Sequence, residues 1–324
     1  MRRLGILLAL CVASPALAQN PEKLPIVGLL RLNTPETAEP IVMALKAALA
    51  ALGQLDGRDI RLDVRLAGGH VERLPELAEA LVREKASVFL ATGLPAIRAA
   101  QRATSTIPIV ADDDDLLAER LIGSLAKPGG NTTGISILAT ELDAKRLEIL
   151  KEILKEILPA ARRIAVLRDP SNSVPARLQA VADAARALGV ELQAVDVRGL
   201  ADLAPAFVSF LTEGAEAVNI LASPVLFSFR EELGRLSLNQ KLPAMGQWRE
   251  MAEAGCLAAY GPTQRELAAM RAALADKMLK GARPGETPAQ QPTRFELVVN
   301  QRTAHAIGVE IPRSILGRAD EVIE

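Results

Sequence analysis

Two aromatic side chains are the residues of this chain best suited to contact a small molecule. Aromatic residues make up 2% of the sequence, and Trp248 and Tyr260 are its only tryptophan and its only tyrosine. Each stands at the end of a predicted strand, and ligands of open α/β sheets bind beyond the carboxyl ends of the strands. The rings could pack against an apolar part of a ligand. The alternative is that both rings cap a core while their polar tips reach water.

The segment from Thr92 to Pro95 could hold a carboxylate. It ends a predicted strand and opens a helix, so its free backbone N–H groups and the positive end of the helix dipole favour an anion. Gly93 permits close approach of the backbone to a ligand, and Pro95 suits the first helical turn. The alternative is an ordinary turn with a threonine cap.

Polar residues also follow the first strand of each half of the chain. Arg31, Asn33 and Thr34 come after the first predicted strand, and Arg31 could pair with an anion or lie on the rim of a cleft. The matching loop of the second half contains Asp169 and Asn172, which could bond to an amine or a hydroxyl. Both are also ordinary turn residues.

Four adjacent aspartates, Asp112–Asp115, form a loop whose charges favour solvent, raise one another's pKa or attract a cation. We favour a solvated loop in which Asp115 caps a helix that starts at Leu116. Adjacent carboxylates cannot all converge on one Ca²⁺ ion, so no metal site is expected. Ser136 and Ser223 lie on connections that could face a cleft, where they would hydrogen-bond a ligand or form plain turns.

No pattern of residues supports catalysis. The sequence contains no G-x-x-x-x-G-K-[ST], G-x-S-x-G, H-E-x-x-H or G-x-G-x-x-G, and Ser124 to Lys127 matches S-x-x-K without its companion motifs. His70 and His305 have no spacing that would pair them with each other or with Cys256. Small and apolar neighbours predict that Cys256 is a buried strand residue. We therefore expect no enzyme and no cofactor.

Short apolar runs alternate with segments of helical period, which predicts βαβ units with parallel sheets. Five strands, from Ile26–Leu30 to Asn131–Ile137, form a first sheet, and a second set runs from Arg163–Leu167 to Cys256–Tyr260. A long helix, Gln264–Lys280, and a closing strand, Phe295–Val299, complete the chain. The expected fold class is α/β, with two doubly wound Rossmann-like lobes of parallel sheet joined by a hinge and a ligand between them.

The N-terminus predicts export. A basic start, an apolar run from Leu4 to Val12 and small residues before Gln19 indicate a cleaved signal peptide over residues 1–18. Its loss leaves 36 basic against 39 acidic residues, a net charge of −3, which predicts no nucleic-acid partner. Charged residues interrupt every later apolar run before the ~20 residues of a membrane helix, so we expect a protein that is not embedded in the membrane. The signal peptide would direct it to the periplasm, where we expect a monomer.

Several motifs in a fixed order then resemble a known family. They are Pro128-Gly-Gly-Asn-Thr-Thr-Gly134, Glu141-Leu-Asp-Ala-Lys-Arg-Leu147, Trp248-Arg-Glu-Met-Ala-Glu-Ala-Gly255 and Gln291-Pro-Thr-Arg-Phe-Glu-Leu-Val-Val-Asn300. From about Pro25 to the C-terminus, the chain resembles ABC-transporter substrate-binding proteins of the tryptophan-binding-protein-like group, which have the type I periplasmic binding fold. The resemblance implies capture of an amino acid or similar small carboxylate for a membrane permease with a separate ATPase subunit.

The resemblance also implies lobes that are discontinuous in sequence. Residues 24–138 with about 263–290 would form the first lobe, and residues 139–262 with about 291–324 the second. Arg31 departs from the small residues usual in the family, and the loop with Asp169 departs from its Asn-Pro-Asn pattern. The mechanism would be closure of the two lobes around the ligand. The alternatives are a ligand sensor that signals to a membrane receptor and an exported hydrolase on the same scaffold.

Overall fold

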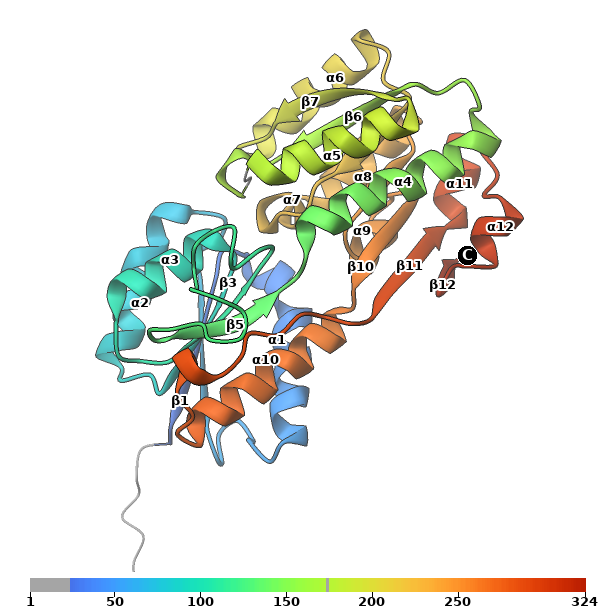
Figure 1. The fold of residues 1–324 in the computed structure, drawn as a ribbon. Helices are drawn as coiled ribbons and strands as arrows, with labels where there is room; N and C mark the ends of the chain where they lie inside the picture. Colours follow the sequence, from blue (N-terminus) through green and yellow to red (C-terminus); the bar gives the residue numbers. More distant parts are fainter. Residues whose placement is uncertain (1–23, 173–174) are drawn as a thin grey trace, which may run out of the picture.

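The computed structural model describes residues 24–172 and 175–324, which form two α/β lobes (Figure 1). The expected signal peptide and the side chain of Asn172 lie outside this description. Each lobe is a sheet with helices on both faces, as the alternation of apolar runs and helical segments predicts. The expected fold class is therefore confirmed.

The sheet of the first lobe has five parallel strands in the order β2-β1-β3-β4-β5. Strand β2 lies at one edge and is half exposed, as its alternating sequence predicts. The strands are β1 (Ile26–Arg31), β2 (Arg61–Leu66), β3 (Val88–Thr92), β4 (Ile109–Asp113) and β5 (Thr132–Ser136). The helices are α1 (Pro35–Ala51), α2 (Leu74–Arg83), α3 (Leu94–Ala103) and, from much later in the chain, α10 (Gln264–Leu279), with the 3₁₀ turns η1 (Val71–Arg73) and η4 (Pro284–Glu286).

Alternating side chains divide the core of the first lobe between the two faces of its sheet. Leu90 of β3 packs in the cluster that contains residues of α1 and α10, whereas Phe89 and Ala91 pack in the cluster that contains α2 and α3. Gly134 of β5 lies so close to β4 that a β-carbon on it would be 1.9 Å from the carbonyl oxygen of Ala111. The same alternation decides which strand-end side chains share a face.

The sheet of the second lobe has seven strands in the order β12-β11-β10-β9-β8-β6-β7. Helices α4 and α5 pack together, and α6 and α8 contribute to a separate core cluster. The strands are β6 (Arg163–Arg168), β7 (Glu191–Asp196), β8 (Ala217–Ile220), β9 (Ala244–Gly246), β10 (Ala258–Pro262), β11 (Phe295–Asn300) and β12 (Glu321–Ile323). The helices are α4 (Ala139–Ile157), α5 (Pro175–Leu188), α6 (Leu203–Thr212), α7 (Pro224–Ser228), α8 (Arg230–Asn239), α9 (Arg249–Glu253), α11 (Gln301–Ile307) and α12 (Arg313–Leu316), with the 3₁₀ turns η2 (Pro170–Asn172) and η3 (Leu200–Asp202).

The chain passes between the two sheets three times. It does so between β5 and α4, between β10 and α10, and in the segment that leads from η4 to β11 (Figure 1). Because β10 leads out of the second lobe and β11 leads back into it, these neighbouring strands are antiparallel. The second sheet is thus mixed at one end, where the sequence predicts only parallel strands.

Three local expectations are wrong. The aspartate run does not form a solvated loop, because Asp112 and Asp113 are the last residues of β4 and are buried together with Asp114. Asp115 accepts hydrogen bonds from the backbone N–H groups of residues 117 and 118, but it caps a turn and not a helix. Cys256 is fully buried, as expected, yet it precedes β10 and is not part of the strand.

Candidate ligand-binding site

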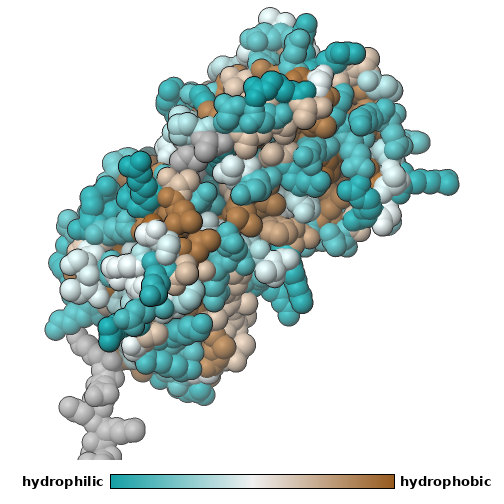
Figure 2. Space-filling model, viewed as in Figure 1, coloured by the Kyte–Doolittle hydropathy of each residue, from teal (hydrophilic) through white to brown (hydrophobic). Residues whose placement is uncertain are grey.

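Both lobes line a cavity of about 670 Å³. The first lobe contributes Leu32, after β1, and the segment Gly68–Val71, after β2. The second lobe contributes Asp169 and its neighbours after β6, Arg198–Leu200 after β7, and Phe229. Figure 2 shows apolar surface where the lobes meet, between mainly hydrophilic outer faces. The cavity therefore lies where parallel strands end, which is the expected place for a ligand.

A buried ion pair joins the lobes. Nη1 of Arg177, on α5 of the second lobe, lies 2.8 Å from Oδ2 of Asp114, which follows β4 of the first lobe. The same guanidinium bonds to Asp143 and to the backbone carbonyl oxygen of Ala222. Burial lowers the pKa of Arg177, but the two carboxylates outweigh it and raise this pKa. The closed arrangement of the lobes thus contains a charge-assisted bond that cannot persist when they separate.

The turn from Thr92 to Gly93 forms part of the contact between the lobes. Gly93 has φ +84° and ψ 146° at the start of α3, and a β-carbon on it would lie 3.0 Å from Cγ of Pro224 in the second lobe. The hydroxyl oxygen of Thr92 accepts a 2.8 Å hydrogen bond from Nη1 of Arg31. The predicted anion site at this helix start therefore already contains an arginine of the same lobe.

Asp169 and Ser223 lie together on the opposite side of the cleft. The hydroxyl of Ser223 donates a 2.7 Å hydrogen bond to Oδ2 of Asp169. It also accepts hydrogen bonds from the backbone N–H groups of Val225 and Leu226, so it is the N-cap of α7. The hydroxyl and the backbone N–H of Ser171 both donate to Oδ1 of Asp169. Asp169 also lines the cavity.

The two aromatic residues occupy different places. Trp248 packs edge-on against Phe227, with ring centroids 4.7 Å apart, in a cluster of the second lobe that Ile41 of the first lobe joins. Its Nε1 is buried and has no hydrogen-bond partner in the described structure. Tyr260 lies in β10, half-buried, between core clusters of both lobes, where its carbonyl oxygen accepts a hydrogen bond from Arg146. Neither ring is among the lining residues of the 670 Å³ cavity.

The remaining predicted residues mainly support local structure. Asn33 is buried and accepts a 2.9 Å hydrogen bond from Nε of Arg31. Thr34 is the N-cap of α1, and Asp115 caps the turn after β4. Ser136, at the end of β5, accepts a hydrogen bond from the backbone N–H of Leu116. These contacts place Asn33 beside the cluster at Thr92 and the other three in capping or turn positions.

Comparison with known proteins identifies the family. The model of the family described as ABC transporter substrate binding protein matches residues 34–323. The chain belongs to this family. It is 24% identical over 266 residues to a tyrosine-binding protein of Clostridioides difficile (strain R20291), with 81% of this chain and 75% of that protein covered. Members of the family are substrate-binding proteins and not enzymes.

Two solved structures show the same fold. A Streptococcus pneumoniae ABC domain in complex with L-Trp is 22% identical, with a TM-score of 0.82 over 93% of this chain and 100% of that chain. The ligand-free, open structure of a Clostridium difficile substrate-binding protein with adhesive properties is 21% identical, with a TM-score of 0.65 over 93% and 99%. This substrate-binding protein therefore superposes better on the ligand-bound relative than on the open one.

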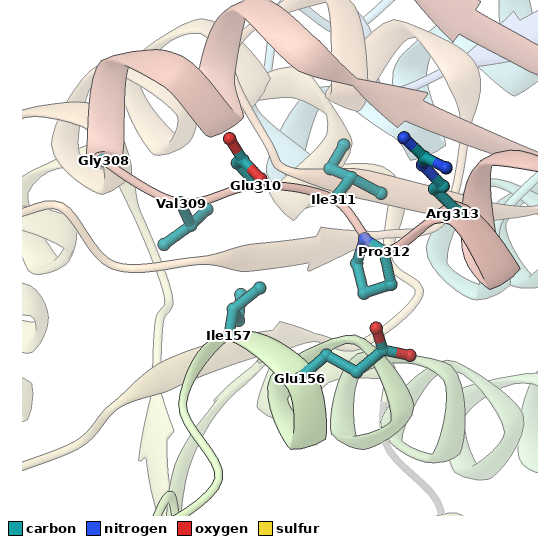
Figure 3. Close-up of a pocket in the computed structure, with 8 residues that line it drawn as sticks. All are labelled: Glu156, Ile157, Gly308, Val309, Glu310, Ile311, Pro312 and Arg313. Carbon is teal, nitrogen blue, oxygen red and sulfur yellow. The ribbon is translucent and has the colours of Figure 1, made fainter.

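A second hollow of this substrate-binding protein lies away from the cleft. It has a volume of about 410 Å³, and the second lobe alone forms it, from the end of α4 and the loop between α11 and α12 (Figure 3). Glu156 at its edge accepts a 3.1 Å hydrogen bond from the hydroxyl of Ser314. Because no part of the first lobe lines this hollow, a ligand in it could not drive closure.

Sequence reasoning missed several residues of the cleft. Gly68–Val71, Arg198–Leu200 and Phe229 line the cavity, although none of them was expected to contact a ligand. The first two segments follow β2 and β7, so the rule that ligands bind beyond strand ends could have found them. Across the described residues no cluster of His, Cys, Asp and Glu could hold a metal ion, and no helix there is long and apolar enough to span a membrane.

Proposed function

We propose that this protein captures an amino acid or a related small carboxylate between its two lobes and delivers it to a membrane permease. The cavity lined by both lobes carries this proposal, because one ligand in it would touch both. The tyrosine-binding relative and the L-Trp complex support the ligand class. The protein would act in the periplasm, after loss of residues 1–18, and the permease would work with a separate ATPase subunit.

The mechanism is a shift from an open to a closed state. A ligand that contacts both lobes binds the closed state better, and this difference in affinity drives closure. The first lobe would comprise residues 24–138 and about 263–290, and the second residues 139–262 and about 291–324. Thr92, Gly93, Asp169 and Ser223 lie at the contact between these lobes and are the predicted site residues that we retain next to the ligand.

Binding can be tested by calorimetry and by the fluorescence of Trp248. The refolded, ligand-free chain from Gln19 onward would be titrated with a panel of amino acids and small organic acids. We expect saturable binding of at least one amino acid and a change in Trp248 fluorescence, because Ile41 of the first lobe packs in the same apolar cluster. If no compound of the panel gave a binding signal in either measurement, the amino-acid assignment would be contradicted.

A pair of variants tests the location of the site. Phe229→Ala removes a ring from the cavity wall and should weaken binding by about 1 kcal/mol or more, at least fivefold. Leu211→Ala removes an apolar side chain that is 50% exposed on α6 and should leave binding unchanged. Equal effects of the two variants would place the ligand elsewhere. Unchanged uptake of the bound solute in a strain that lacks the protein would favour the sensor over the importer.

A further inference from the structure

Arg31 is a buried cation without a carboxylate partner. The residue is only 5% exposed. Its guanidinium donates hydrogen bonds to two neutral groups, from Nε to Oδ1 of Asn33 at 2.9 Å and from Nη1 to Oγ1 of Thr92 at 2.8 Å. No carboxylate oxygen in the described part of the chain lies within 4.0 Å of its nitrogens. A buried charge is normally paired, because leaving water without a counter-charge is unfavourable.

The surroundings of Arg31 increase this deficit of negative charge. Arg271 of α10 lies close to Arg31 and forms an ion pair with Asp112, so two guanidinium groups share one nearby carboxylate. Burial and Arg271 lower the pKa of Arg31 to about 9, although Asp112 opposes this. Nη1 of Arg271 and Oδ1 of Asp112 are buried and have no hydrogen-bond partner in the described structure.

These groups lie together at the cleft end of the first sheet. Thr92 pairs in register with Asp112, and the register of β1 with β3 continues to place Arg31 beside Thr92. All three are the residues of their strands that point to the face covered by α1 and α10, as the core cluster on that face shows. The excess positive charge therefore belongs to one compact group at the carboxyl ends of β1, β3 and β4.

Asp169 of the second lobe is a buried carboxylate that lacks a cationic partner. It is 5% exposed and accepts hydrogen bonds from Ser171 and Ser223, but no cationic nitrogen in the described residues lies within 4.0 Å of it. It also lines the cavity between the lobes. The two other titratable residues that line the cavity have partners. Nη2 of Arg198 lies 4.0 Å from Oδ2 of Asp196, and Nδ1 of His70 lies 3.0 Å from Oε1 of Glu72.

A short series of contacts connects the two unpaired charges across the cleft. Arg31 bonds to Thr92, and the next residue, Gly93, lies against Pro224 of the second lobe. The residue before Pro224 is Ser223, which bonds to Asp169. Closure of the lobes thus places a buried positive group and a buried negative group on the two sides of the Gly93–Pro224 contact. Asp169 lines the cavity, whereas Arg31 lies directly before Leu32, the residue after β1 that lines it.

We propose that the ligand is a zwitterion whose carboxylate binds Arg31 and whose ammonium group binds Asp169. This inference rests on the proposed function and adds the charge type and orientation of the ligand. Each end supplies the counter-charge that one lobe lacks, so the ligand links the lobes electrostatically. A compound that has lost either charge leaves one of the two buried groups unpaired.

Ligand analogues test the inference with the unaltered protein. Calorimetry would compare L-tyrosine and L-tryptophan with their amides, which lack the carboxylate, and with the corresponding propionic acids, which lack the amine. We expect each change to weaken binding at least tenfold. If either analogue binds within threefold of its parent amino acid, the inference is overturned while the amino-acid function stands. If the unaltered protein binds no compound of the series, the inference fails together with the amino-acid assignment.

Two variants assign each charge to its residue. Arg31→Met should reduce the preference for the amino acid over its amide to less than threefold and leave the preference over the propionic acid intact. Asp169→Asn should do the reverse, and Arg31→Lys should restore part of the preference for a carboxylate. Preferences unchanged in both variants, with normal circular dichroism spectra, would overturn the assignment. The analogue series on the unaltered protein decides the question if a variant does not fold.

Discussion

Replacing Asp114 by asparagine should weaken ligand binding although this residue is not proposed to touch the ligand. Its carboxylate lies 2.8 Å from Nη1 of Arg177 in the other lobe, and the two side chains are 12% and 3% exposed. This pair exists when the lobes are closed. Asp114→Asn keeps the shape of the side chain and removes its charge, so it should destabilise the closed state selectively.

The magnitude follows from the burial of the pair. Two unit charges about 4 Å apart attract by about 4 kcal/mol at an effective dielectric constant near 20. Asparagine can still accept one hydrogen bond, and Arg177 retains Asp143 as a partner, so we expect a loss of about 2–3 kcal/mol. If the free protein is mainly open, the free energy of ligand binding weakens by the same amount, so the dissociation constant rises about 30–150-fold. Most of this change should be faster dissociation.

The assay is calorimetry with L-tyrosine or L-tryptophan, combined with stopped-flow dissociation. The matched control is Asp183→Asn, which makes the same charge change on the helix that carries Arg177, but at a side chain that is 53% exposed. Thermal unfolding without ligand should be nearly unchanged in both variants, because the open protein lacks the bond between the lobes. An Asp114→Asn protein that binds within twofold of the unaltered protein would refute the reasoning.

Two further predictions concern a turn and a buried carboxyl group. Gly93→Ala forces an alanine into φ +84° and ψ 146°, which should lower the free energy of unfolding by about 1–3 kcal/mol. It also brings a β-carbon to 3.0 Å from Cγ of Pro224 in the other lobe, so it should weaken ligand binding as well. Adding Pro224→Ala should restore affinity but not stability in chemical denaturation, and a double variant that still binds weakly would count against this contact. Burial, and then repulsion by Asp114 and Glu119, raises the pKa of Asp113 well above its usual value, so the folded protein keeps a proton that the unfolded chain loses. The free energy of unfolding should therefore fall as pH rises from about 4 through the raised pKa of Asp113, and Asp113→Asn should remove this loss. In urea unfolding, the gain in stability of Asp113→Asn over the unaltered protein should be larger at pH 8 than at pH 5. An equal gain at both pH values would argue against a raised pKa.

The sequence by itself determined the fold class and most of the strand and helix order. Apolar strands such as Val88–Thr92 are buried on both faces, and the alternating strand β2 is a half-exposed edge, so periodicity alone located them. The turn at Gly93 was also identifiable, because a glycine between a strand and a helix indicates close backbone approach.

Only the tertiary structure decided how the polar residues combine. Asp112–Asp114 look like a solvated run, but all three are buried. Asp112 and Asp114 have ion-pair partners, Arg271 and Arg177, that come from about 160 and 60 residues away. Likewise Arg31 and Asp169 lie on the two sides of one contact only because the lobes meet at Gly93 and Pro224. Tyr260 lies between the cores of the two lobes. The period of apolar residues is a local property that can be read directly from the sequence. Charge pairing depends on which distant residues the fold brings together, and a single sequence does not contain that information.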